Sequence, residues 1–144
     1  MTSCYLDTSF LIKLYVFEDQ STEAAELLRL GGFLAITNSL SAVEVVSTLR
    51  RKVQDKVLTA AEAAKGIAAF RADQVTKLYE RKVVDEATFV LAERLVDQHG
   101  DFIRLRSLDL IHVATALQYG IDGFATYDKD LKVLVQRVGL KLLH

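Results

Sequence analysis

The chain has 144 residues, of which 51% are apolar, with 18 Lys or Arg against 19 Asp or Glu and a formal net charge of -1. This length and apolar content suit one domain over residues 1–144, and the near-neutral charge excludes a generally basic protein that gathers nucleic acid by long-range attraction. With no apolar run near the roughly 20 residues that span a bilayer, no leader-like N-terminus and a single cysteine, we expect a soluble, cytoplasmic protein with no membrane role.

Short apolar segments alternate with helical patterns along the chain. Strands are predicted at residues 3–6, 33–37 and 140–143, with weaker candidates at 75–79 and 123–127. Helical periodicity covers residues 9–17, 21–30, 39–53, 59–71, 85–99, 107–119 and 130–138. Strands that alternate with helices indicate parallel βαβ units. We therefore predict an α/β fold with a central parallel sheet of four or five strands flanked by helices.

Capping residues mark the expected helix ends. Thr59 with Glu62 forms a capping-box pattern, and Ser21, Ser39 and Ser107 are each predicted to cap a backbone N–H group. Several glycines follow the helical patterns, where a left-handed residue can close the last turn: Gly31, Gly32, Gly100, Gly120 and Gly139.

Two acidic residues follow predicted strands directly. Asp7 ends the first apolar run, and Asp128 follows the segment at 123–127. Because ligands of open α/β sheets collect outside the carboxyl ends of the strands, both carboxylates are placed to reach a ligand. Asp is also a favoured N-cap, so capping explains either position equally well when it is taken alone.

Two further acids lie in apolar helical surroundings. Glu44 has valine neighbours on both sides and needs a cation, a hydrogen-bond donor or a metal, because a half-buried carboxylate without a partner destabilises the fold. A nearby Arg or Lys is the ordinary alternative. Asp109 lies in a first helical turn, where it also favours the helix dipole. His112, three residues on, is expected to be a packed or hydrogen-bonded residue.

Four sequence blocks carry a family resemblance across essentially the whole chain. They are YLDTS at 5–9, SAVEV at 41–45, LDLIHVATA at 108–116 and ATYDKDL at 125–131. In this order and context they resemble PIN-domain ribonucleases, specifically the VapC-like toxins of type II toxin-antitoxin modules. One departure is Leu110, where many relatives carry a small residue.

The resemblance implies a metal-dependent endoribonuclease. It places an acidic pocket at Asp7, Glu44, Asp109 and Asp128, which binds Mg²⁺ or Mn²⁺ and cleaves RNA phosphodiester bonds. It also implies a homodimer and inhibition by a VapB-like antitoxin protein. Small polar positions beside the acids are matched by Thr8, Ser9 and Thr126.

The chemistry of the residues agrees with that implication. Crowded carboxylates need a divalent counter-charge, oxygen ligands suit Mg²⁺ and Mn²⁺, and the Cys and His spacing of zinc sites is missing. We expect Asp7 and Asp109 to be the main metal ligands, with Glu44 and Asp128 completing the site. Basic residues near these acids are candidates for holding RNA: Arg50, Arg51, Lys52, Lys56, Arg104 and Arg106.

Two alternatives stay open for the function. Intact acids permit catalysis without requiring it, so a noncatalytic binding module derived from a PIN nuclease is one, and a PIN nuclease of RNA processing is the other. Apolar residues at 11, 12 and 14–17 nearly surround the first predicted helix. That helix is therefore either buried in the monomer or covered by a second subunit or protein.

Overall fold

The computed structural model describes residues 2–144 as five parallel strands in one sheet, flanked by seven helices. The strands are β1 (Ser3–Leu6), β2 (Leu34–Asn38), β3 (Glu80–Lys82), β4 (Gly123–Ala125) and β5 (Lys141–Leu142). The helices are α1 (Thr8–Tyr15), α2 (Ser21–Leu30), α3 (Ser39–Gln54), α4 (Ala60–Val75), α5 (Glu86–His99), α6 (Ser107–Gln118) and α7 (Lys129–Arg137). The predicted α/β fold is confirmed.

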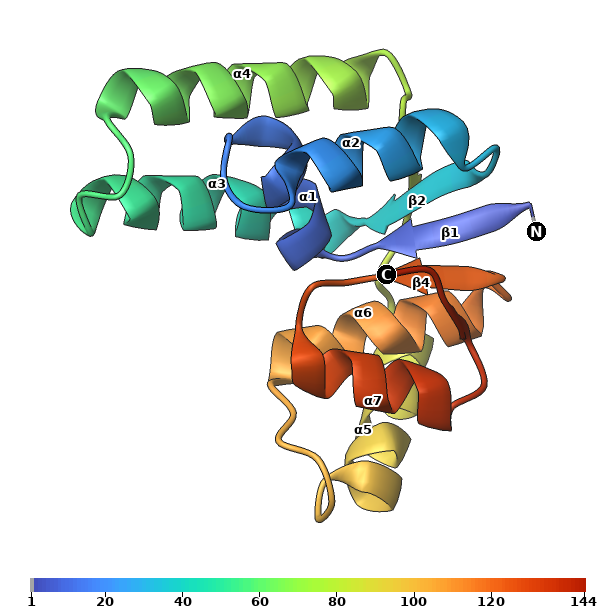
Figure 1. Ribbon diagram of the computed structural model, residues 1–144. Coiled ribbons are helices and arrows are strands. Elements are labelled where there is room, and N and C mark those ends of the chain that lie inside the picture. Colours follow the sequence, from blue (N-terminus) through green and yellow to red (C-terminus); the bar gives the residue numbers. More distant parts are fainter. Residues whose placement is uncertain (1) are drawn as a thin grey trace.

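Helices cover both faces of the sheet, as Figure 1 shows, with α1 to α4 on one side and α5 to α7 on the other. Side chains alternate along β1 accordingly. Cys4 and Leu6 are fully buried in the cluster with α1 to α4, whereas Tyr5 is fully buried on the opposite face, stacked on Phe124 at 5.2 Å between ring centroids. Both faces of β1 are therefore core, as expected for a central parallel strand.

The order of strands, β3-β2-β1-β4-β5, reverses at β1. The chain builds β2 and β3 outward on one side, then returns through α5 and α6 to place β4 on the other side of β1. The loops that follow β1 and β4 consequently turn away from each other and leave a crevice at the carboxyl edge of the sheet. Asp7 and residues 126–128 stand at that edge.

One predicted strand is wrong. Residues 75–79 were expected to form it, but Val75 ends α4 and the strand is Glu80–Lys82. This strand pairs through its backbone with β2 at the edge of the sheet, and its side chains are exposed or half-buried. A charged edge strand needs no apolar pattern and discourages pairing with other chains, so periodicity misses it.

The predicted caps are partly correct. Thr59 and Glu62 form the expected capping box of α4. Ser21, Ser39 and Ser107 are instead the first residues of their helices, and α3 is capped by Asn38. Among the glycines after helices, Gly32, Gly120 and Gly139 have positive φ, whereas Gly31 and Gly100 are right-handed.

None of the helices within residues 2–144 is long and apolar enough to span a membrane.

The packing of α4 against α1 requires a glycine. A Cβ atom at Gly66 would lie 2.6 Å from the backbone oxygen of Tyr15 and 3.3 Å from Leu49. We expect Gly66→Ala to lower the free energy of unfolding by about 1–2 kcal/mol, because the clash outweighs the better helix propensity of alanine. Urea unfolding measures this change, and a more stable variant would contradict the close contact.

Candidate active site

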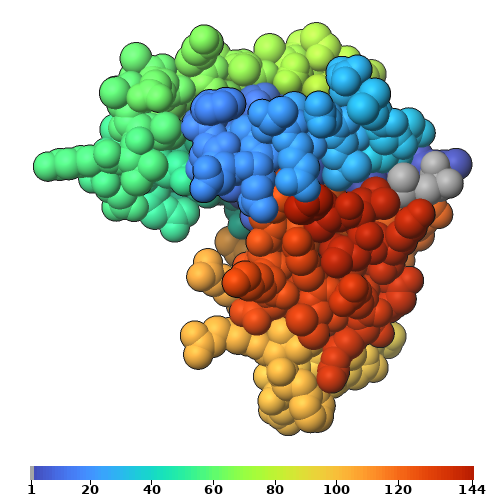
Figure 2. Space-filling view, in the orientation of Figure 1, coloured from blue at the N-terminus to red at the C-terminus, as the bar shows by residue number. Residues whose placement is uncertain are grey.

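The four acidic residues predicted from the sequence line one hollow. Asp7, Glu44, Asp109 and Asp128 come from the ends of β1 and β4 and from α3 and α6, and they border a space of about 570 Å³. In Figure 2 the molecule is indented between the layer of α1 to α4 above and the layer of α5 to α7 below. The fold thus gathers carboxylates that are up to 121 residues apart in the chain, from 7 to 128.

Asp7 is 2% exposed and holds its place through three hydrogen bonds. Its Oδ1 accepts from the Phe10 backbone at 2.9 Å and from the Ser9 hydroxyl at 2.7 Å, and its Oδ2 accepts from Thr126 at 2.5 Å. Burial raises the pKa of Asp7 and the three hydrogen bonds oppose that rise only in part. Asp7 therefore caps α1, as one reading predicted, and it also lines the pocket, while its role toward a ligand stays a prediction.

Two hydroxyl groups join the end of β1 to the end of β4. Ser9 accepts from the Tyr127 backbone at 2.9 Å while donating to Asp7, and Thr126 accepts from the Asp128 backbone at 3.0 Å while donating to Asp7. Asp128 in turn caps α7 through the Leu131 backbone at 2.9 Å. The small polar residues beside the acids orient carboxylates and backbone, as their positions suggested.

The partner of Glu44 is a histidine, not an Arg or Lys. His112 is 1% exposed, and its Nε2 contacts Glu44 Oε1 while its Nδ1 lies 2.5 Å from the buried Tyr5 hydroxyl. Thr8 donates to the same Glu44 oxygen at 2.9 Å. Burial alone would raise the pKa of Glu44, but the hydrogen bond and charge of His112, helped by Thr8, lower it below its usual value.

This Tyr5–His112–Glu44 chain was missed as a unit by the sequence analysis. The available signal was the spacing of three residues between Asp109 and His112, which puts both on one side of α6. Glu44 Oε2 has no hydrogen-bond partner within residues 2–144 and is left for water or a ligand.

Asp109 is the least compensated of the four acids. Its half-buried carboxylate receives no hydrogen bond within the described residues, and its pKa is raised to about 6, first by burial and then by the charges of Asp128 and Asp7. His112 offsets this rise only in part. A cation in the pocket would offset both effects by stabilising the ionised carboxylate.

The residues present fit a hard divalent cation bound through few protein ligands. Among residues 2–144 no group of three or more His, Cys, Asp or Glu side chains has the arrangement to hold a metal ion. Mg²⁺, however, keeps several waters and often takes only one or two carboxylates from the protein. The uncompensated charge at Asp109 and the all-oxygen donor set agree with such an ion.

Basic side chains border the pocket. Lys13 and Lys52 both pair with Glu18, at 3.2 and 3.4 Å, whereas Arg51 and Arg106 form no ion pair within the described part of the chain. The two free arginines are therefore able to contact an anion beside the acids. Three other basic residues suggested by the sequence do not line this pocket: Arg50, Lys56 and Arg104.

Comparison with known proteins gives a consistent result. The PIN domain family model matches residues 4–135. Ribonuclease VapC46 of Mycobacterium tuberculosis is 27% identical over 145 residues, which cover 99% of this chain and 98% of the relative. The structure of VapC20 of the same species, a sarcin-ricin loop cleaving toxin, has a TM-score of 0.74 at 19% identity and 96% coverage of both chains. VapBC2 of Rickettsia felis, bound to promoter DNA, has a TM-score of 0.65 at 14% identity, covering 98% of this chain and 97% of that one.

Asp109 makes the metal-free protein less stable as the pH rises. The pKa of Asp109 is about 6 in the folded state, whereas the unfolded chain releases this proton near the ordinary aspartate pKa of 3.8. Stability is therefore lost between these two values. We expect Asp109→Asn to raise the free energy of unfolding by about 1 kcal/mol at pH 8, after allowance for solvent screening, and to change it little below pH 4.

Urea unfolding in EDTA at several pH values measures this difference. Asp101→Asn, at an exposed site outside the pocket, is the matched control. A gain for Asp109→Asn that is equal at pH 4 and pH 8 would rule out charge repulsion as its source.

His112 supports Glu44 from inside the core. His112→Phe keeps a similar ring volume but leaves the Tyr5 hydroxyl without its partner and Glu44 Oε1 with Thr8 alone, so we expect a loss of about 2–3 kcal/mol in unfolding free energy. Tyr5→Phe removes only the hydrogen bond between Tyr5 and His112 and should lower the free energy of unfolding by less. If His112→Phe is as stable as the parent in urea, the hydrogen bonds that link Tyr5, His112 and Glu44 do not contribute to stability.

Proposed function

The chain belongs to the PIN-domain family, and we propose that it is a metal-dependent endoribonuclease, a VapC-like toxin that cleaves RNA phosphodiester bonds with Mg²⁺ or Mn²⁺. The observation that carries the proposal is the meeting of Asp7, Glu44, Asp109 and Asp128 around one pocket at the carboxyl edge of the sheet. A ribonuclease of this family that aligns over nearly the full length supports the reaction class.

Asp7 and Asp109 are the residues proposed to hold the cation, with Glu44 and Asp128 completing the pocket. When bound, the ion supplies charge stabilisation at the phosphate and a more acidic water. Ser9 and Thr126 fix the direction of the Asp7 carboxylate. Because the Asp7 carboxylate is already held in one direction, it needs little rearrangement when the cation and the phosphate bind.

Glu44 is proposed to accept a proton from the attacking water or to orient it. His112 and Thr8 hold its Oε1 and keep the carboxylate ionised, while Oε2 is unpartnered. Because its pKa is lowered, Glu44 is ionised near neutral pH but is a weak base, so it suits a hydrogen-bond acceptor that orients the water better than a strong general base. Arg51 and Arg106 are proposed to hold the RNA backbone beside the acids.

We also propose a VapB-like antitoxin, a homodimer and a cytoplasmic site of action. Structures similar to this chain include a toxin-antitoxin complex from Klebsiella pneumoniae, with a TM-score of 0.59 at 17% identity over 89% of each chain. Exposed apolar side chains give partners a surface, since Leu108 at the pocket is 45% exposed and Val43, on the other side of α3, is 65% exposed. The single, buried Cys4 suits a reducing compartment.

Asp7→Asn tests the proposed reaction. Asn keeps the acceptor oxygen that caps α1, so the fold is retained, but it removes a negative charge from the metal pocket. We expect cleavage of a mixed panel of structured and single-stranded RNAs to fall by at least about a hundredfold, as for removal of a main electrostatic contributor. Gel-resolved cleavage with Mg²⁺ or Mn²⁺, and with EDTA, measures this loss beside calorimetric metal binding.

The exposed Asp101→Asn variant, purified identically, is the control for contaminating nucleases. Equal magnesium-dependent cleavage by parent and Asp7→Asn would overturn the assignment of Asp7. Absence of metal binding by the parent would instead favour a noncatalytic module.

A further inference from the structure

A second hollow lies on the other side of α3. It runs between α3 and α4, which project together past the sheet in Figure 1, and it has a volume of about 820 Å³. Its floor is aliphatic and its charged lining is entirely basic. The lining residues are Ala42, Val43, Val46, Ser47, Arg50, Arg51, Gln54, Phe70, Arg71 and Gln74.

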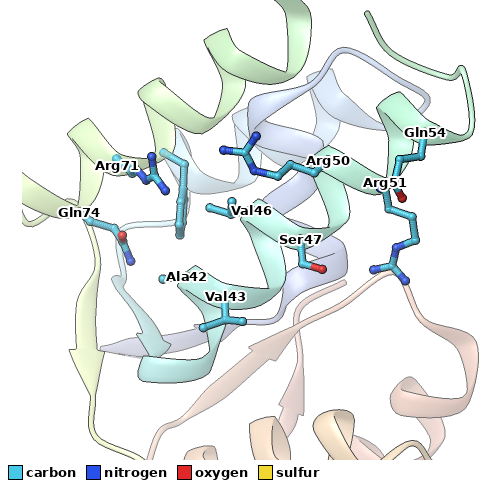
Figure 3. Close-up of a pocket in the computed structure, with 10 residues that line it drawn as sticks. Ala42, Val43, Val46, Ser47, Arg50, Arg51, Gln54, Arg71 and Gln74 are labelled. Carbon is cyan, nitrogen blue, oxygen red and sulfur yellow. The ribbon is translucent and has the colours of Figure 1, made fainter. Parts of the chain in front are cut away.

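The arginines of this groove have no partner in the protein. Within residues 2–144, Arg50, Arg51 and Arg71 form no ion pair and no side-chain hydrogen bond. Figure 3 shows Arg50 reaching from α3 toward α4, where Arg71 extends into the same space. Like charges placed so close favour a bound anion, which replaces their mutual repulsion with attraction.

The acids of α3 and α4 do not neutralise these arginines. Asp73 accepts a hydrogen bond from Tyr15 at 2.6 Å, Glu62 caps the start of α4, and Glu44 is held by His112 on the other side of α3. The side-chain nitrogen of Gln74 is buried at the groove without a partner, so a hydrogen-bond donor is also available there.

The groove and the acidic pocket share one lining residue, Arg51. Glu44, Thr48 and Arg51 follow one another on the stripe of α3 that faces the pocket, and Arg51 borders both hollows. At 1.5 Å per helical residue, Glu44 and Arg51 are about 10 Å apart along the axis. An extended RNA segment that passes through the pocket therefore reaches Arg51, at the border of the groove, within a few nucleotides.

We propose that single-stranded RNA on one side of the cleaved bond runs past Arg51 into the groove between α3 and α4, where Arg50 and Arg71 contact its phosphates. This inference rests on the proposed ribonuclease function and names the path of its substrate. Phe70 is fully buried, so the groove offers no exposed aromatic ring for base stacking. The contacts are to the backbone, and the binding there is salt-dependent and tolerant of base sequence.

The test uses the double variant Arg50→Ala/Arg71→Ala in the full chain. Both residues are exposed and alanine is the best helix former, so the fold is retained. Binding of a long unstructured RNA is measured across a salt series with Ca²⁺ in place of Mg²⁺. Loss of two phosphate contacts should reduce the slope of log affinity against log salt by about 1.4.

Cleavage gives a second readout. We expect the KM for a long RNA to rise by roughly fivefold or more and kcat to change much less, with a smaller rise for an oligonucleotide that spans only the acidic pocket. Arg94→Ala, an exposed arginine on α5, is the matched control. An unchanged slope and KM in a double variant whose parent cleaves RNA would overturn the path and leave the ribonuclease intact.

Two other results separate the possibilities. If the parent neither binds nor cleaves RNA, the proposed function fails and the path fails with it. If poly-L-glutamate displaces the RNA from the parent as well as an RNA competitor of equal charge does, the groove is a general acceptor for acidic chains, and the specific path for RNA is wrong.

Discussion

The pairing of β1 with β4 is the contact on which the site depends. It joins the first strand to one that lies about 120 residues later, and it is reinforced past the strand ends by the Asp7 backbone, which donates to Ala125 at 3.2 Å. Because β2 and β3 extend from the other edge of β1, the loops after β1 and β4 part at this point. The crevice that results is a property of the strand order, and the side chains only decide what it binds.

Placing several acids in this crevice destabilises the fold through burial and repulsion of their charges. The protein compensates some of these carboxylates with hydrogen-bond donors and leaves one without any. Asp7 is surrounded by donors, and Glu44 is held by a buried histidine, so both have structural partners that do not depend on a ligand. Asp109 has none, and its pKa is raised first by burial and then by the charges of Asp128 and Asp7. Carboxylates whose pKa values are strongly shifted in a cleft are common at functional sites, which is why Asp109 is a candidate ligand in the proposed function.

The sequence predicts the fold well where side-chain patterns follow burial. β1 and α2 both match their predicted limits, because the apolar pattern and the residues at the ends of each segment indicate the same boundaries. β3 was misplaced because its register comes from backbone pairing at an edge. The four acids were chosen because their sequence blocks follow the order seen in PIN-domain proteins. The resemblance implied that they share one pocket, and all four line it. The link between Glu44 and His112 could not be predicted, because it depends on how α3 and α6 approach each other across the sheet.

Helix α3 brings three surfaces of different character together. Val45 and Leu49 face the core, Glu44 borders the acids, and Arg50 borders the basic groove. The net charge of the whole chain is only -1, yet an acidic surface and a basic surface lie on different sides of α3. Arg51 borders both hollows, so the two surfaces meet at that residue. The same rigid helix that separates the acidic pocket from the basic groove also fixes the distance between them.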